Sequence, residues 1–261
     1  MRLIIKPTSN EASLFAAHHI AKKINLFNPS SDKPFVLGLP TGSTPLMTYA
    51  ELIKLYQNGA LSFQNVITFN MDEYLGLEAR HEQSYHYFMY HNFFHHIDIQ
   101  EENIHILNGM AANPEKECQD YEKAIRAVGG IHLFLGGVGQ DGHIAFNEPF
   151  TSLSSRTHIQ PLTQSTIRAN SRFFGGDTSK VPTKALTVGV QTIMDSEEVM
   201  ILAFGQNKAD ALYHSLECGI SHKWTLSAVQ MHQNALIVCD EEAASKLTAE
   251  TKAYFSNIEN S

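Results

Sequence analysis

The sequence has few cysteines, no excess of positive charge and no long hydrophobic run. Three cysteines among 261 residues, without paired spacing, are typical of reduced thiols and exclude a disulfide framework. The formal net charge of -8 excludes a broad surface for nucleic acid or anionic lipid. No apolar stretch approaches the ~20 residues of a membrane span, and the run after Arg2 is too short for a signal peptide. We therefore expect a cytoplasmic protein without nucleic-acid or membrane partners.

The sequence also lacks a recognisable metal-binding pattern, although it contains 14 histidines. No HExxH motif and no Cys/His ligand spacing is present. Of the clustered histidines, only His91 and His95 are four apart and so share a helix face. We therefore expect no metal and interpret these histidines as partly exposed helix residues.

Apolar runs and helical patterns alternate along the whole chain. This order predicts an α/β fold of the Rossmann-like kind: a doubly wound, mostly parallel sheet with helices on both faces. No linker or repeat divides the chain, so we expect one domain over residues 1–261. The expected strands are 1–6, 35–39, 66–69, 104–107, 131–135, 185–190, 199–204 and 236–239. The first expected helix begins after Thr8, and the others span 46–56, 84–95, 114–128, 207–217 and 241–254. Residues 151–182 have only weak periodicity.

One glycine-rich stretch, LGGVGQDGHIAFNEP at 135–149, follows a predicted buried strand. Its glycines match G-x-G-x-x-G from Gly137, which is found in dinucleotide sites. Such a site also needs a helix at once and an acidic residue about 20 positions on. Pro149 comes too early for that helix, and no acidic residue lies between Glu148 and Asp177. We therefore expect no organic cofactor.

The polar residues of this stretch are acid–base groups. Asp141 and His143 are two apart and point the same way in an extended segment, and Glu148 is held extended by the following proline. Carboxylates fix the orientation of an imidazole and favour its charged form, which suits a proton carrier. The alternative is a turn in which Asp141 caps backbone amides and His143 lies on the surface.

The segment PTGSTP at 40–45 joins a predicted strand to a predicted helix. Ser43 or Thr44 is expected at the N-cap and Pro45 at the first helical position. Backbone N–H groups at such a start bind phosphate, although a plain cap is the alternative. Lys208 begins another helix, where a cation is unfavourable unless an anion joins it.

Asp72 follows the predicted strand 66–69. A carboxylate at the carboxyl end of a strand is placed to act as a base in the crevice of an α/β sheet, and the alternative is a turn cap. Together, the phosphate cradle, this carboxylate and the Asp/His/Glu cluster predict proton transfer on a small phosphorylated molecule, without metal or cofactor.

Five motifs are jointly similar to one known family. They are LPTGSTP at 39–45, FNMDEY at 69–74, LGGVGQDGHIAFNEP at 135–149, NSRFF at 170–174 and ALTVGV at 185–190. With them, residues 1–254 resemble the glucosamine-6-phosphate deaminase family. The resemblance implies conversion of glucosamine 6-phosphate and water to fructose 6-phosphate and ammonia in amino-sugar catabolism.

The resemblance also implies roles for individual residues. His143 opens the sugar ring, Asp141 and Glu148 orient it and tune its pKa, and Asp72 moves a proton from C2 to C1. A lid is expected at about 162–182. The implied phosphate ligands are Gly42, Ser43, Thr44, Arg172 and Lys208.

One departure from the family concerns regulation. Allosteric members are activated by N-acetylglucosamine 6-phosphate at a subunit interface, through an Arg and a Lys near the positions of His158 and Gln160. In this chain those positions hold His158 and Gln160, so the basic pair is missing, whereas Ser152 and Tyr254 of that site remain. We therefore expect weak or absent activation, in a homo-oligomer that is a hexamer if the family assembly is kept.

Two other functions are weighed. 6-Phosphogluconolactonase, a related ester hydrolase, needs no base for a C2 proton. A sugar-phosphate sensor needs none of the four acid–base residues and usually carries a DNA-binding domain. The Asp72 motif and the full DGHIAFNEP run favour the deaminase.

Overall fold

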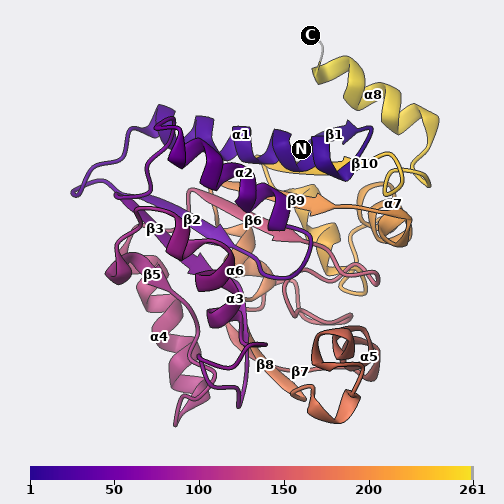
Figure 1. The fold of residues 1–261 in the computed structure, drawn as a ribbon. Coiled ribbons are helices and arrows are strands. Elements are labelled where there is room, and N and C mark those ends of the chain that lie inside the picture. The colour runs from indigo at the N-terminus through magenta and orange to yellow at the C-terminus, as the bar shows by residue number, and fades with distance from the viewer. Residues whose placement is uncertain (260–261) are drawn as a thin grey trace.

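Seven parallel strands form the main sheet of the computed structural model, which describes residues 1–259 (Figure 1). Their order is β1-β10-β9-β6-β2-β3-β5. This arrangement confirms the predicted mostly parallel, doubly wound α/β fold. The strands are β1 (Arg2–Lys6), β2 (Phe35–Leu39), β3 (Val66–Asn70), β5 (Ile104–His105), β6 (Leu133–Gly137), β9 (Glu198–Ala203) and β10 (Ala235–Asp240).

Helices cover both faces of this sheet. Side chains of successive strand residues point to opposite faces, and they divide the core into two clusters. Val199 and Ile201 of β9 belong to one cluster, with residues of α4 and α7, and Met200 belongs to the other, with residues of α1 and α2. The helices are α1 (Ser9–Phe27), α2 (Leu46–Gln57), α3 (Tyr85–Asn92), α4 (Pro114–Ala127), α6 (Val190–Met194), α7 (Ala209–Leu216) and α8 (Ala249–Glu259).

The helix ends follow the sequence signals in several places. Thr8 Oγ1 accepts a hydrogen bond from Glu11 N at 3.2 Å and caps α1, and Asn28 ends it in the left-handed conformation. Asn113 caps α4 in the same way through Lys116 N. Within residues 1–259, no helix is both long and apolar enough to cross a membrane. The three cysteines are unpaired, as expected.

A second, antiparallel sheet was not predicted. It consists of β4 (Asp72–Tyr74), β8 (Lys184–Thr187) and β7 (His158–Pro161), in the order β4-β8-β7. The expected strand 185–190 is therefore wrong in its bounds, because Val190 already begins α6. The weakly periodic segment contains β7, α5 (Gln164–Asn170) and the 3-10 turns Ser171–Phe174 and Thr178–Lys180. Strands of three or four residues are too short to give a clear periodic signal.

The predicted last helix, 241–254, is also wrong. Asp240 accepts hydrogen bonds from Gly205 N and Ala243 N, and the chain that follows turns instead of starting a helix. Thr248 then accepts a bond from Thr251 N at 3.2 Å, and α8 begins at Ala249. The local cap therefore decides where this helix begins.

The aromatic helix expected at 84–95 ends earlier, at Asn92, and a 3-10 turn (Phe94–His96) follows. Its end is packed inside the chain, because Phe93 stacks on Tyr49 of α2 with ring centroids 4.7 Å apart.

Candidate active site

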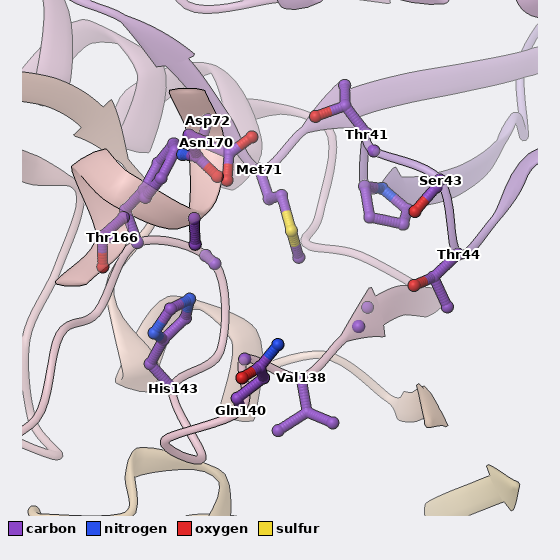
Figure 2. Close-up of a pocket in the computed structure, with 18 of the residues that line it drawn as sticks. Thr41, Ser43, Thr44, Met71, Asp72, Val138, Gln140, His143, Thr166 and Asn170 are labelled. Atoms are coloured by element: carbon purple, nitrogen blue, oxygen red, sulfur yellow. The ribbon is translucent and has the colours of Figure 1, made fainter. Parts of the chain in front are cut away.

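The carboxyl ends of β2, β3 and β6 border a cleft of about 250 Å³. In Figure 2, Asp72 and His143 lie on opposite sides of it, and Thr41, Ser43 and Thr44 lie along a third side. Of the nine residues predicted for catalysis and phosphate binding, only Glu148 does not line the cleft. The lining ones are Gly42, Ser43, Thr44, Asp72, Asp141, His143, Arg172 and Lys208. The sheet therefore gathers side chains from positions far apart in the sequence.

His143 lies between two carboxylates. Its Nδ1 is 2.7 Å from Asp141 Oδ1, outside hydrogen-bond geometry, and 4.0 Å from Glu148 Oε2. Burial raises the pKa of Asp141, but contact with His143 outweighs it and brings that pKa below its ordinary value. Asp141 is therefore ionised at neutral pH and holds the ring. The ligand atoms of these three residues lie within 4.8 Å of one another, so the expectation of no metal here stays a prediction.

The loop that carries these residues, termed the His143 loop (138–148), is held by hydrogen bonds to its neighbours. Asn147 Nδ2 donates to Ile144 O and to Val188 O, both at 2.9 Å. Thr225 Oγ1 accepts from Ile144 N at 3.2 Å and donates to Asn147 O at 3.1 Å. These hydrogen bonds hold the backbone that follows His143 in place.

Two glycines of this loop are required by close approach. A Cβ at Gly139 would lie 2.6 Å from Cε1 of His143. A Cβ at Gly142, whose φ is +77°, would lie 2.4 Å from Cε3 of Trp224. Glycine leaves room for both rings and adopts this φ without strain.

Asp72 is 6% exposed and begins β4. Its Oδ1 is buried and has no hydrogen-bond partner within residues 1–259. It therefore does not cap a turn. Burial first, and then the charge of Glu73, raise the pKa of Asp72 well above its ordinary value. When ionised, this carboxylate is a strong base that faces the cleft.

The β2–α2 loop (40–45) corrects one expectation. Neither Ser43 nor Thr44 caps α2, because Pro45 already has helical angles and itself occupies the cap position. In the described part of the chain, the hydroxyls of Thr41, Ser43 and Thr44 make no hydrogen bond, and all three residues line the cleft. These donors remain available to a bound anion.

Two cations complete this side of the cleft. Lys208 Nζ donates to Val138 O at 2.6 Å. Burial first, and then the nearby charge of Arg172, lower the pKa of Lys208 to about 8, against the opposite effect of Asp141. A 3-10 turn (Gln206–Lys208) leads into α7, so Lys208 precedes the helix and does not belong to its first turn. Two cations that repel each other beside unpaired hydroxyls are typical of an anion site.

The residues of the expected allosteric site do not meet within one chain. Ser152 precedes β7, which contains His158 and Gln160, and His158 Nε2 is 3.0 Å from Gln160 Oε1. Tyr254 lies on α8, at the opposite end of the molecule in Figure 1, and is 61% exposed. A site made from all four would need a second subunit.

Sequence reasoning missed several lining residues. Tyr85 lines the cleft and was not among the expected site residues. Thr166 and Asn170 come from α5, which the weak periodicity concealed. Asn170 begins the NSRFF motif and Thr166 lies in the predicted lid, but neither was assigned to the site.

Residues 7–238 match the family described as glucosamine-6-phosphate isomerases/6-phosphogluconolactonase. The chain belongs to this family. A glucosamine-6-phosphate deaminase of Borreliella burgdorferi (strain ZS7) is 60% identical over 259 residues, which cover 99% of this chain and 97% of that protein. One of Treponema denticola is also 60% identical, over 99% of this chain and 96% of that protein. The predicted family and enzyme type are confirmed.

Solved structures agree with this family assignment. A protein described as a monomeric glucosamine-6-phosphate deaminase has a TM-score of 0.90 and 42% identity, over 94% of this chain and 100% of that chain. A 6-phosphogluconolactonase of Trypanosoma brucei has a TM-score of 0.75 at 21% identity, over 95% and 98%. The second likeness shows the shared fold alone.

Proposed function

We propose that the protein converts glucosamine 6-phosphate and water to fructose 6-phosphate and ammonia, as a cytoplasmic enzyme of amino-sugar catabolism. One observation carries the proposal: Asp72 presents a buried, unpaired carboxylate oxygen in the cleft that also contains the His143–Asp141 pair and two cations. The relatives named as glucosamine-6-phosphate deaminases support it.

The phosphate would bind between the β2–α2 loop and the two cations. Lys208 and Arg172 supply charge, and Ser43 and Thr44 supply hydroxyl donors. Gly42 brings the backbone to the same place. This anchoring would leave the sugar ring between His143 and Asp72.

Ring opening would come first. His143, held by Asp141 and Glu148, would move a proton from the C1 hydroxyl to the ring oxygen as the C1–O5 bond breaks. The ionised Asp72 would then take the C2 proton and return it at C1, while a proton passes from the nitrogen on C2 to the C1 oxygen. This leaves a hydroxymethyl group at C1 and an imine at C2. Water adds to this imine and ammonia leaves, so the atoms of substrate and water balance those of the products.

Three further statements belong to the proposal. Segment 162–182 acts as a lid, since Thr166, Asn170 and Arg172 from it line the cleft. Activation by N-acetylglucosamine 6-phosphate is weak or absent, since His158 and Gln160 supply no fixed positive charge. The protein is a homo-oligomer. Light scattering coupled to size-exclusion chromatography tests this statement. A measured mass of 29.1 kDa would mean a monomer, like the related protein described as monomeric, and would contradict it.

The test is an ammonia-release assay on glucosamine 6-phosphate, with and without N-acetylglucosamine 6-phosphate. We expect ammonia and fructose 6-phosphate in equal amounts and a hyperbolic rate curve in both cases. Hydrolysis of 6-phosphogluconolactone without ammonia release from glucosamine 6-phosphate would overturn the assignment. A sigmoidal curve that the N-acetyl sugar makes hyperbolic would contradict only the statement on activation.

A further inference from the structure

Glu73 is a second buried carboxylate beside Asp72, and the proposed reaction leaves it without a role. It lies between Asp72 and Tyr74 in β4 and is 2% exposed. Successive side chains of a strand point to opposite faces. Asp72 lines the cleft and Glu73 does not. Glu73 therefore lies behind the proposed base and makes no contact with substrate.

The carboxylate of Glu73 joins β4 to the start of α3. Its Oε1 accepts from Tyr74 N at 2.8 Å and from Tyr85 N at 3.0 Å, and its Oε2 accepts from His86 N at 2.9 Å. Tyr85 and His86 are the first two residues of α3, whose N–H groups have no partner inside the helix. A carboxylate there makes strong bonds and matches the helix dipole.

This anchor fixes one wall of the cleft. Tyr85 lines the cleft, and its ring is stacked on Phe146 of the His143 loop, with centroids 6.0 Å apart and an interplanar angle of 7°. Its ring also lies 4.9 Å from that of Tyr74. Tyr74 in turn accepts a hydrogen bond from Asn170 of α5 at 2.9 Å. The wall thus connects β4, the His143 loop and the proposed lid.

The charge of Glu73 acts on Asp72 as well. Burial raises the pKa of Glu73 to about 6, against the effect of the three backbone N–H groups. Glu73 is therefore mostly ionised at neutral pH. After burial, its charge is the other cause that raises the pKa of Asp72. Asp72 is consequently a stronger base, once ionised, than burial alone would make it.

We propose that Glu73 is a positioning residue for proton transfer by Asp72: it anchors Tyr85 at the cleft and places a negative charge behind the base. This role rests on the proposed function. Glu73 therefore has two effects that different substitutions can separate. Its side chain holds the N–H groups at the start of α3, and its negative charge raises the pKa of Asp72.

Two variants separate these effects. Glu73→Gln keeps the length of the side chain and removes the charge, so the pKa of Asp72 falls. We expect the acid limb of kcat/KM for glucosamine 6-phosphate to move to lower pH, because Asp72 stays ionised to lower pH. Glu73→Asp keeps the charge but cannot reach both helix N–H groups. It should leave the acid limb in place and lower kcat about tenfold through misplacement of Tyr85, with little change in KM.

Glu122 offers a matched control, because it is also a buried glutamate, accepts from Thr157 N at 3.0 Å, and lies away from the cleft. Glu122→Gln should lower stability without moving the pH profile. A carbon-13 NMR titration of the aspartate carboxyls in the ligand-free protein should show a lower pKa of Asp72 in Glu73→Gln and no such change in Glu122→Gln. The signal of Asp72 is assigned by its loss in Asp72→Asn.

The outcomes separate the two proposals. If the active Glu73→Gln enzyme keeps the wild-type acid limb and Asp72 titration, the role of Glu73 is wrong and the deaminase assignment stands. Changes of equal size in Glu122→Gln would also overturn that role. If the wild-type protein releases no ammonia, the proposed function fails and the role of Glu73 in its proton transfer fails with it.

Discussion

The two loops that meet at the cleft differ in how far their polar groups are already paired. The His143 loop is tied on several sides, through Asn147 and Thr225. The β2–α2 loop presents the hydroxyls of Thr41, Ser43 and Thr44, none of which has a hydrogen-bond partner in the described chain. The His143 loop is hydrogen-bonded within the protein, whereas the three hydroxyls of the β2–α2 loop line the cleft without a partner in the described chain.

This difference separates positioning from binding. Buried polar groups are almost always paired, so a loop whose backbone is hydrogen-bonded at several points holds its side chains in one geometry before any ligand arrives. Unpaired donors around a pair of cations instead make their bonds with the ligand. We infer that the His143 loop is pre-organised for proton transfer and that the β2–α2 loop is adapted to hold an anion.

The largest expected effect comes from Asp72, which neither loop supplies. Asp72→Asn removes the proposed base and keeps the shape, so kcat for ammonia release should fall by about 10² to 10⁴-fold. Binding of inorganic phosphate, measured by calorimetry, should change little because the β2–α2 loop is intact. Asp98→Asn is the control, since Asp98 accepts from Phe63 N and does not line the cleft. Normal turnover by Asp72→Asn would show that another group is the base.

The pairing within the His143 loop is tested by Asn147→Ala. This change leaves the buried carbonyls of Ile144 and Val188 without their donor, so the free energy of unfolding should fall by about 2–4 kcal/mol. Urea denaturation measures the loss. Asn92→Ala, which removes one partly buried bond to Phe88 O, should cost less than about 1.5 kcal/mol. Equal losses in the two variants would contradict the idea that this loop is specially fixed.

The anion side should respond to pH through Lys208. Its pKa of about 8 lies below the ordinary value for lysine, so the ligand-free site loses this positive charge as pH rises through 8. Binding of sulfate, whose charge is constant in this range, should weaken about tenfold between pH 7 and pH 9. Lys208→Met should bind sulfate weakly at both pH values. A wild-type affinity that does not change with pH would exclude Lys208 as a ligand of the anion.

The sequence predicts much of the active site because polar residues at strand ends are local features. Asp72 follows β3 and His143 follows β6, and parallel strands bring their carboxyl ends to one edge. The pairing of β4 with β8 was not predictable in this way. It joins Asp72 to Thr187, more than a hundred residues away, through strands too short for a periodic signal.

Glu73 and Pro45 show a second limit of sequence reasoning. Glu73 is next to a motif residue, but only its contact with α3 shows what it holds. Ser43 and Thr44 are residue types that often cap helices, but the backbone angles of Pro45 make Pro45 the N-cap of α2. In both cases the residue type is local information, whereas its partner depends on the tertiary structure.

The smallest expected effect tests the two loops with the same substitution. Thr44→Val removes an unpaired hydroxyl, so phosphate affinity should fall only about 2- to 12-fold, with the free energy of unfolding unchanged. Thr225→Val removes a hydroxyl that pairs with Ile144 N and Asn147 O, so it should cost about 1–3 kcal/mol of stability and leave phosphate affinity nearly unchanged. Calorimetry with inorganic phosphate and urea denaturation measure the two quantities on both variants. If Thr44→Val destabilises the protein as much as Thr225→Val, the hydroxyl of Thr44 has a partner inside the protein and is not kept for a ligand.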